Sequence, residues 1–174
     1  MSEKLLTDAA LNVKETFDKI KKAAESAGRN PSEIRLMAVT KTVAPEKINE
    51  AIEAGCYLLG ENRVQELLEK YESYDKRAEI HFIGRLQTNK VKYIVDKVSM
   101  IESVDSIKLA EEIERRCAKI GKTMDILLEV NIAEEESKGG FSAEEIIDVS
   151  EKNQEFSPFK TARTYDYRAF WGRN

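Results

Sequence analysis

The chain is 174 residues long, which is enough for one domain with a substantial hydrophobic core. Hydrophobic residues make up 41% of the chain and charged residues 34%, a composition typical of a globular protein rather than a disordered one. The net charge of −4 argues against a general binder of nucleic acids or anionic membranes, because such a binder needs a basic face.

The sequence has no motif for export, membrane insertion or zinc binding. The first 30 residues mix acids and bases throughout, unlike a signal peptide. No run approaches the roughly 18 apolar residues of a membrane-spanning helix. Cys56 and Cys117 lie far apart, and His81 is the single histidine, so no zinc-ligand spacing occurs. We therefore expect a cytoplasmic protein with two buried free thiols.

The chain opens with an amphipathic helix. Apolar residues recur at spacings of three and four from Leu5 to Ala24, and Gly28 supplies a stop. A strand-like run, "EIRLMAV", follows at residues 33–39. Pro45 then stands at the first position of a predicted helix that runs to Gly55.

Strand-like and helical segments alternate along the rest of the regular part of the chain, and Ser142 and Glu145 have the spacing of a capping box at the start of the last helix. Strict alternation predicts a parallel sheet and an α/β fold with right-handed crossovers. The predicted strands are 56–60, 79–84, 98–104 and 124–132, and the predicted helices are 64–74, 89–97, 106–121 and 142–153.

A leading helix and five strand–helix units therefore make up residues 1–154. The strands are nearly continuous apolar runs, as expected when both faces of a sheet are covered. The pattern leaves two architectures open, because five units suffice for an open doubly wound sheet but are three short of a closed (β/α)8 TIM barrel.

Polar residues gather at the carboxyl ends of these strands, which is the edge where active groups of parallel α/β folds lie. Each residue also has an ordinary explanation, since a strand-end lysine is usually solvated, a lone histidine is usually packed in the core, and an asparagine often caps a loop. The candidates, in strand order, are Lys41, Asn62, His81, Ser103 and Asn131.

Lys41 carries the most specific chemistry among these candidates. It follows the apolar run "LMAVT", and partial removal from water at that place would favour the free amine. A free amine is a nucleophile that forms Schiff bases with aldehydes.

Five segments of the chain resemble, in order and spacing, the YggS/PROSC family of pyridoxal phosphate homeostasis proteins. The likeness extends over residues 5–152, and "GEN" followed by "HFIGRLQTNK" is its most specific part. The resemblance implies a (β/α)8 barrel like the N-terminal domain of alanine racemase, with pyridoxal 5′-phosphate (PLP) held as a Schiff base on Lys41. The segments are "MAVTKTVAPEKINEAIEAG", "LGENRVQEL", "IHFIGRLQTNK", "IESVDSIKLAEEI" and "LLEVNIAEEESKGGF".

The resemblance also implies a role. It indicates a protein of intracellular PLP homeostasis without catalytic activity, with PLP-dependent apo-enzymes as acceptors of the cofactor. Asn62 and His81 are expected to touch the PLP ring or its O3′ atom, and Ser103 and Asn131 to complete the far wall of the site. A PLP site needs only a few polar groups, each well aimed.

Three other functions remain open at this point. The first is a fold-type-III PLP enzyme such as an amino-acid racemase, which needs a second proton-transfer group that related enzymes take from another domain. The second is a lyase without cofactor that uses Lys41 directly on a carbonyl substrate. The third is a non-functional truncated fragment.

The last segment, residues 155–174, is an atypical tail rich in aromatic and basic residues, with neither a helical nor a strand period. It matches no segment of the family, so the barrel is expected to be truncated after about five units, without the strands that bind the cofactor phosphate. A shifted reading frame, a wrong gene boundary and a genuine short variant each explain such a tail. Open barrel edges favour self-association, and we expect weak PLP binding unless a second chain completes the barrel.

Overall fold

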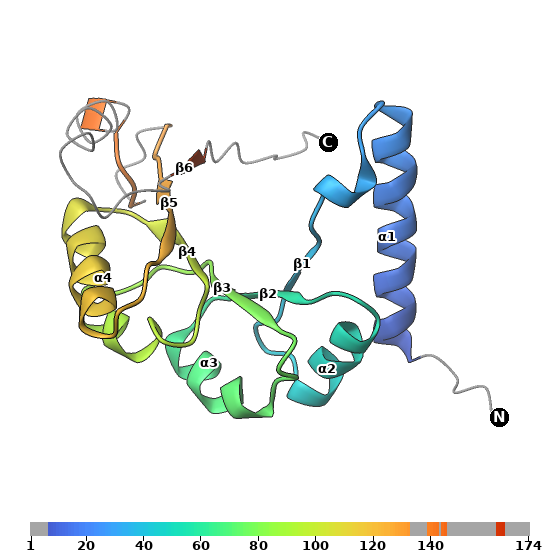
Figure 1. Cartoon of the computed structure of the whole chain (residues 1–174), viewed down its shortest axis with the longest axis horizontal. Coiled ribbons are helices and arrows are strands. Elements are labelled where there is room, and N and C mark those ends of the chain that lie inside the picture. The colour runs from blue at the N-terminus through green and yellow to red at the C-terminus, as the bar shows by residue number, and fades with distance from the viewer. Residues whose placement is uncertain (1–6, 133–138, 143, 146–162, 166–174) are drawn as a thin grey trace. The chain divides into compact units, whose positions relative to one another are not determined.

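The computed structural model describes residues 7–132, 139–142, 144–145 and 163–165 (Figure 1). The chain forms two compact units, Met1–Ile80 and His81–Asn174. In each unit, parallel strands alternate with helices, which confirms the predicted α/β class. In the part of the chain that the structure describes, no helix is both long and apolar enough to cross a membrane.

The first unit opens with the predicted amphipathic helix. The Thr7 side chain caps this helix by accepting a hydrogen bond from the Ala10 amide at 3.3 Å. Pro45 stands at the start of the second helix, as the sequence predicts. The elements are α1 (Asp8–Ser26), η1 (Pro31–Glu33), β1 (Met37–Val39), α2 (Pro45–Glu53), β2 (Leu58–Glu61), α3 (Val64–Lys70) and η2 (Tyr71–Ser73).

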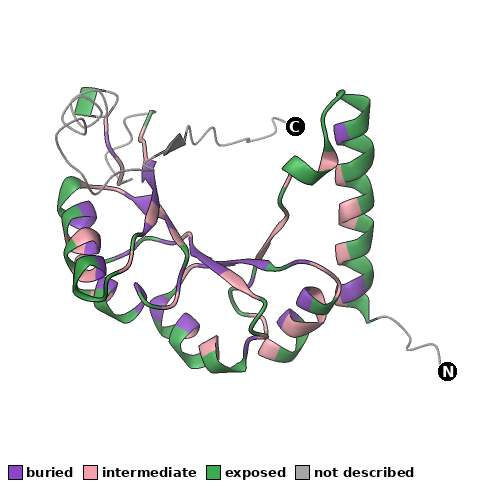
Figure 2. Cartoon of the chain, in the orientation of Figure 1, coloured by how far each residue is buried: buried purple, intermediate pink, exposed green. Residues whose placement is uncertain are grey.

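Strands β1 and β2 pair in parallel, with Met37 opposite Leu58 and Val39 opposite Gly60. Helices α2 and α3 both lie below these strands in the view of Figure 1, and α1 contacts α2. The faces of α2 and α3 toward the strands are buried and their other faces are exposed (Figure 2), which is the amphipathic pattern of surface helices. The core of this unit includes the buried side chains of Ile48, Ile52, Leu59 and Leu67.

In the second unit, four strands pair in parallel in the order β3, β4, β5 and β6. Apolar side chains from β3, β4 and α4 are fully or almost fully buried, among them Phe82, Ile101 and Leu109. The elements are β3 (Glu79–Phe82, which begins in the first unit), η3 (Thr88–Tyr93), β4 (Met100–Val104), α4 (Ile107–Lys119), β5 (Asp125–Glu129) and β6 (Arg163–Tyr165).

Two elements of this unit differ from the sequence prediction. The predicted helix at 89–97 is the 3-10 helix η3 followed by turns, and the Lys122 amine binds the carbonyl oxygens of Val95 and Val98 at 2.7 and 2.6 Å. These carbonyls therefore have a side-chain partner in place of a continued helical ladder. Strand β6 lies in the tail, where the sequence has no strand period, and it pairs with β5 over three residues.

The predicted capping box is confirmed. The Ser142 amide donates to the Glu145 carboxylate at 2.8 Å, and the Glu145 amide donates to the Ser142 hydroxyl at 3.1 Å. The helix predicted beyond this box, through residue 153, lies outside the described residues.

Candidate functional site

Lys41 lies in a turn between β1 and α2, at the carboxyl end of β1. Thr40 continues the line of β1, because its amide donates to the Gly60 carbonyl of β2 at 3.1 Å. Lys41 itself is exposed, so the partial burial that its apolar flank suggests is not found. The structure instead presents the amine to solvent, where a small aldehyde can reach it.

The backbone beside Lys41 has an unusual conformation. Thr42 has a φ of +61°, which is uncommon for a β-branched residue and marks a restrained turn. Its amide donates to the carboxylate of Glu66 on α3. The Lys70 amine donates to the same carboxylate oxygen and, at 3.1 Å, to the Thr40 carbonyl. The hydrogen bond from Lys70 is the main cause that lowers the pKa of Glu66 below its ordinary value.

A buried carboxylate lies at the end of β2. Glu61 is 0% exposed, and its Oε1 atom accepts hydrogen bonds from the Thr40 hydroxyl and the Tyr74 hydroxyl, both at 2.6 Å. Its Oε2 atom has no hydrogen-bond partner among the described residues. Burial, assisted by Glu61, raises the pKa of Tyr74 far above its ordinary value. Glu61 therefore links Thr40, the residue before Lys41, to Tyr74, which directly follows η2.

Asn62 follows Glu61 and has one unpartnered polar atom. Its Oδ1 atom is buried and makes no hydrogen bond within the part of the chain that the structure describes. A side-chain amide offers both a donor and an acceptor, and buried polar atoms are normally satisfied. The residue thus fits a site that receives a polar group from a ligand. Lys41 and Asn62 each lie two positions beyond a register pair, Val39 and Gly60, at the same edge of the two strands.

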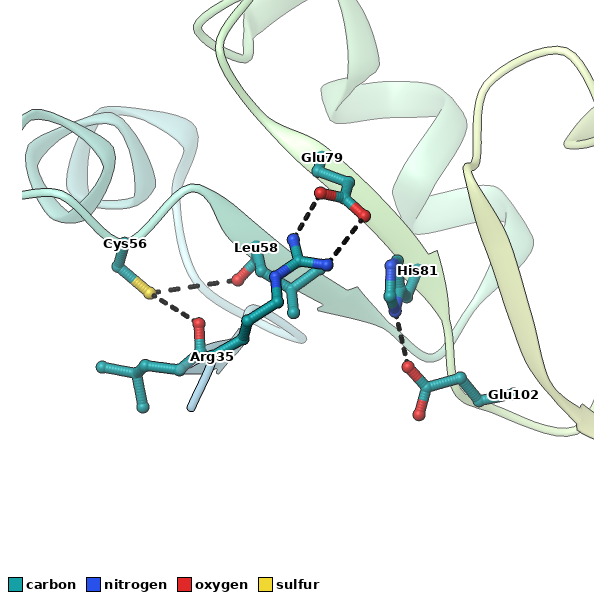
Figure 3. Close-up of polar contacts among 7 residues, drawn as sticks. Arg35, Cys56, Leu58, Glu79, His81 and Glu102 are labelled. Atoms are coloured by element: carbon teal, nitrogen blue, oxygen red, sulfur yellow. Dashed lines mark hydrogen bonds and ion pairs between the residues drawn. The ribbon is translucent and has the colours of Figure 1, made fainter. Parts of the chain in front are cut away.

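The second unit contains the other three predicted residues. His81 is 4% exposed on β3, and its Nδ1 atom lies 2.5 Å from Oε1 of Glu102 on β4 (Figure 3). The contact fixes the orientation of the imidazole ring. Ser103 is buried, and its hydroxyl donates to the Gly84 carbonyl at 2.5 Å. The hydroxyl proton of Ser103 is therefore committed to the backbone.

Asn131 lies just past β5, where the backbone pairs with that of Phe141. The Asn131 amide donates to the Phe141 carbonyl at 2.9 Å, and the Phe141 amide donates to the Glu129 carbonyl at 2.8 Å. Gly140 makes this approach possible, because its φ is +119° and a Cβ atom there would lie 3.0 Å from the Asn131 nitrogen.

A cavity of about 240 Å³ opens at the carboxyl ends of β4 and β5 in the second unit. Its walls include Ser103 and three carboxylates, Glu102, Asp105 and Glu129, with Arg85 at its edge. Burial, and then the nearby Asp105, raise the pKa of Glu129. Arg85 lies 3.8 Å from Asp105 and offsets part of the negative charge of this wall.

The two thiols are structural. Cys56 is buried, and its Sγ atom lies 3.6 Å from the Leu36 carbonyl and 3.9 Å from the Leu58 carbonyl (Figure 3). Burial raises the pKa of both Cys56 and Cys117, which keeps them as unreactive thiols. The prediction of two buried free cysteines is confirmed. Figure 3 also shows the exposed Arg35–Glu79 ion pair, which links the approach to β1 with the start of β3.

The sequence predicts Asn62 as a site residue, but it does not predict the buried group of Glu61, Thr40 and Tyr74 beside it. The quoted motif "GEN" contains Glu61, and a carboxylate directly after the apolar run "YLLG" is the signal that points to a buried polar group there. Thr40 and Tyr74 carry no comparable signal, because their contacts with Glu61 arise only from the fold.

Comparison with known proteins identifies the family. The family model described as "Alanine racemase, N-terminal domain" matches residues 12–165, including the described strand of the tail. A relative from Aquifex aeolicus, named "Pyridoxal phosphate homeostasis protein", is 44% identical over 154 residues, which are 88% of this chain and 68% of that protein. The chain belongs to this family. The family and the barrel-type fold predicted from the sequence are thereby confirmed.

Solved structures agree with this membership. A structure described as an unknown protein from Bifidobacterium adolescentis is 34% identical and superposes with a TM-score of 0.81 over 97% of this chain and 75% of that one. PipY of Synechococcus elongatus, determined with PLP bound, is 26% identical with a TM-score of 0.64, over 86% of this chain and 71% of PipY. The chain spans 68% of the length of the A. aeolicus relative and 62% of the Escherichia coli K12 one.

Proposed function

We propose that this chain is a PLP-binding protein of cofactor homeostasis that holds PLP as a Schiff base on Lys41. The observation that carries the proposal is the occurrence of an exposed amine on a restrained turn and the unpartnered Oδ1 atom of Asn62 at the same strand edge. The PLP bound to PipY and the names of the curated relatives support the choice of ligand.

The covalent step is simple and reversible. The Lys41 amine adds to the PLP aldehyde, water leaves, and a carbon–nitrogen double bond forms in its place. Hydrolysis reverses the step, and so does transfer of the aldehyde to the lysine of another protein. PLP-dependent apo-enzymes are the acceptors that we propose, and the two buried free thiols support a cytoplasmic location.

The other polar residues have proposed roles around the ring. Asn62 and His81 contact the ring or its O3′ atom, and Glu102 holds the His81 imidazole in one orientation. Ser103 and Asn131 form the far wall.

We propose no catalytic turnover for this chain. A racemase needs one proton-transfer group on each face of the substrate, whereas the curated relatives are named for homeostasis rather than racemisation. An assay of amino-acid racemisation with PLP-saturated protein distinguishes the two functions. Self-association through open barrel edges also stays a prediction, which sedimentation analysis tests directly.

Titration with PLP tests the proposed function. Wild type is expected to develop the visible absorbance of a protein Schiff base, and Lys41→Ala is expected to lose it. Lys47→Ala is the matched control, because Lys47 is another exposed lysine of the same unit, on α2. Equal absorbance in wild type and Lys41→Ala would contradict the proposal, and so would its loss in Lys47→Ala alone.

A further inference from the structure

The two residues that flank Lys41 are both held by helix α3. The Thr40 carbonyl accepts a hydrogen bond from the Lys70 amine at 3.1 Å, and the Thr42 amide donates to the Glu66 carboxylate. Lys70 and Glu66 are themselves joined, since the Lys70 amine donates to the same oxygen that Thr42 uses. The Glu66–Lys70 ion pair therefore forms hydrogen bonds with the turn on both sides of Lys41.

This ion pair differs from an ordinary surface pair on a helix. The side chains of Lys70 and Glu66 are only 12% and 15% exposed, whereas the Lys21–Glu25 pair at the same spacing on α1 is 64% and 55% exposed. A largely buried pair is less screened by solvent and needs hydrogen bonds from other groups. In this pair, those extra bonds go to the backbone of the Lys41 turn.

The conformation of Thr42 explains why the turn needs a hydrogen bond from outside it. A β-branched residue at a φ of +61° is disfavoured by its own sterics, so the turn needs an outside restraint to keep it. The charged acceptor on Glu66 supplies that restraint, because a hydrogen bond to a carboxylate is stronger than one to a neutral group. Strained backbone of this kind is concentrated at functional sites.

We propose that Glu66 and Lys70 form a positioning pair that fixes the turn so that the Lys41 amine is presented in one orientation. The inference rests on the proposed function, since presentation matters only if Lys41 bonds an aldehyde. Neither residue of the pair touches the cofactor in this account, and both act through Thr40 and Thr42. A fixed amine loses less conformational freedom on bonding than a mobile one, so the pair strengthens binding.

Three substitutions separate this role from simple stabilisation of α3. Glu66→Ala removes the acceptor for Thr42 and the partner of Lys70. Glu69→Ala is the matched control, because Glu69 is an exposed acid on the same helix. Thr42→Gly removes the strain, since glycine has no Cβ atom and adopts a positive φ readily. Circular dichroism and urea unfolding establish that each variant is folded.

Two measurements are made on every variant. The first is hydrogen exchange of the Thr42 amide, which needs no cofactor and reports the hydrogen bond between Thr42 and Glu66. The second is the dissociation constant for PLP from the Schiff-base absorbance, with the bonded lysine located after borohydride reduction.

Glu66→Ala is expected to speed exchange of the Thr42 amide and to weaken PLP binding, each by about tenfold, the size of one lost charge-assisted hydrogen bond. Glu69→Ala is expected to change neither. In the Thr42→Gly background, Glu66→Ala is expected to weaken binding by only about two- to threefold, since there is less strain to restrain. Such a rescue would not occur if Glu66 merely stabilised the helix.

The results test the positioning pair and the proposed binding of PLP at Lys41 separately. If wild type bonds PLP at Lys41 and Glu66→Ala binds equally well, the positioning pair is refuted and the proposed function stands. If wild type bonds no PLP at Lys41, the proposed function fails and with it the presentation of the amine. If exchange of the Thr42 amide is unchanged in Glu66→Ala, Glu66 does not restrain the turn, whether or not PLP binds.

Discussion

The buried Glu61 carboxylate offers the sharpest test of how the Lys41 end of the first unit is held together. Tyr74→Phe removes a single hydroxyl, the one that donates to Glu61 Oε1 at 2.6 Å, and leaves the ring in place. Tyr74 is 4% exposed and Glu61 is 0% exposed, so water does not readily replace the lost donor. The substitution therefore isolates one hydrogen bond to a buried carboxylate.

The structure sets the size of the effect. A hydrogen bond to a charged group contributes about 1.5 to 3 kcal/mol to stability. Thr40 still donates to the same oxygen in the variant, which places the expected loss near the lower end, at about 2 kcal/mol. For a chain of this length, that loss corresponds to a decrease of about 4 to 8 °C in the melting temperature.

Urea unfolding monitored by circular dichroism measures this loss directly. Tyr57→Phe is the control, because Tyr57 belongs to the same unit and is 45% exposed, and its free energy of unfolding should change by less than about 0.5 kcal/mol. Equal stabilities of Tyr74→Phe and wild type would refute the buried network. So would a change in the slope with urea and none in the midpoint.

The same network predicts an alkaline pH dependence. Burial, together with Glu61, raises the pKa of Tyr74 in the folded state. A raised pKa means that the neutral phenol stabilises the fold fully below about pH 10, and that this contribution is lost as the pH rises above that value. Wild type should therefore lose stability above about pH 10 more steeply than Tyr74→Phe does.

Three further predictions follow from the fold and the site. Lys70 lowers the pKa of Glu66, so the stability that Glu66 contributes is present above its ordinary pKa of 4.5 and is lost as the pH falls below that value. The difference in melting temperature between wild type and Glu66→Gln should therefore shrink between about pH 6 and about pH 3. A constant difference would contradict this prediction. Burial raises the pKa of Cys56 and Cys117, so a thiol reagent should label neither residue in native protein and both in urea, whereas rapid native labelling would show that the thiols are accessible. Strand β6 pairs with β5, so deleting residues 163–174 should speed hydrogen exchange of β5 amides relative to those of β1, and unchanged exchange throughout β5 would argue against the pairing.

The regular part of the fold was predictable because its elements are encoded locally. Alternating apolar runs and amphipathic segments predict the five strands, and single residues such as Pro45 and Ser142 predict where helices begin. Strand β6 escapes such reasoning, since three residues without a period become a strand only by pairing with β5. Likewise, the sequence does not show that the Lys122 amine, from a residue more than 20 positions away, binds the carbonyls of Val95 and Val98 just beyond η3.

The site was predictable in part. Lys41 and Asn62 follow from their places at strand ends and from the family motifs, because strand order fixes the edge at which they lie. The groups that hold the Lys41 turn were not predictable. Glu66 and Lys70 look like an ordinary i, i+4 pair in the sequence, and only the fold brings them to the backbone of Thr40 and Thr42.

We propose that Lys41 is the residue that bonds PLP. The most direct test is to incubate the protein with PLP, reduce the complex with borohydride, and locate the modified lysine by peptide mass spectrometry. We predict a single pyridoxyl group on Lys41 and none on the exposed control Lys47. A label on another lysine, or no label at saturating PLP, would contradict the account.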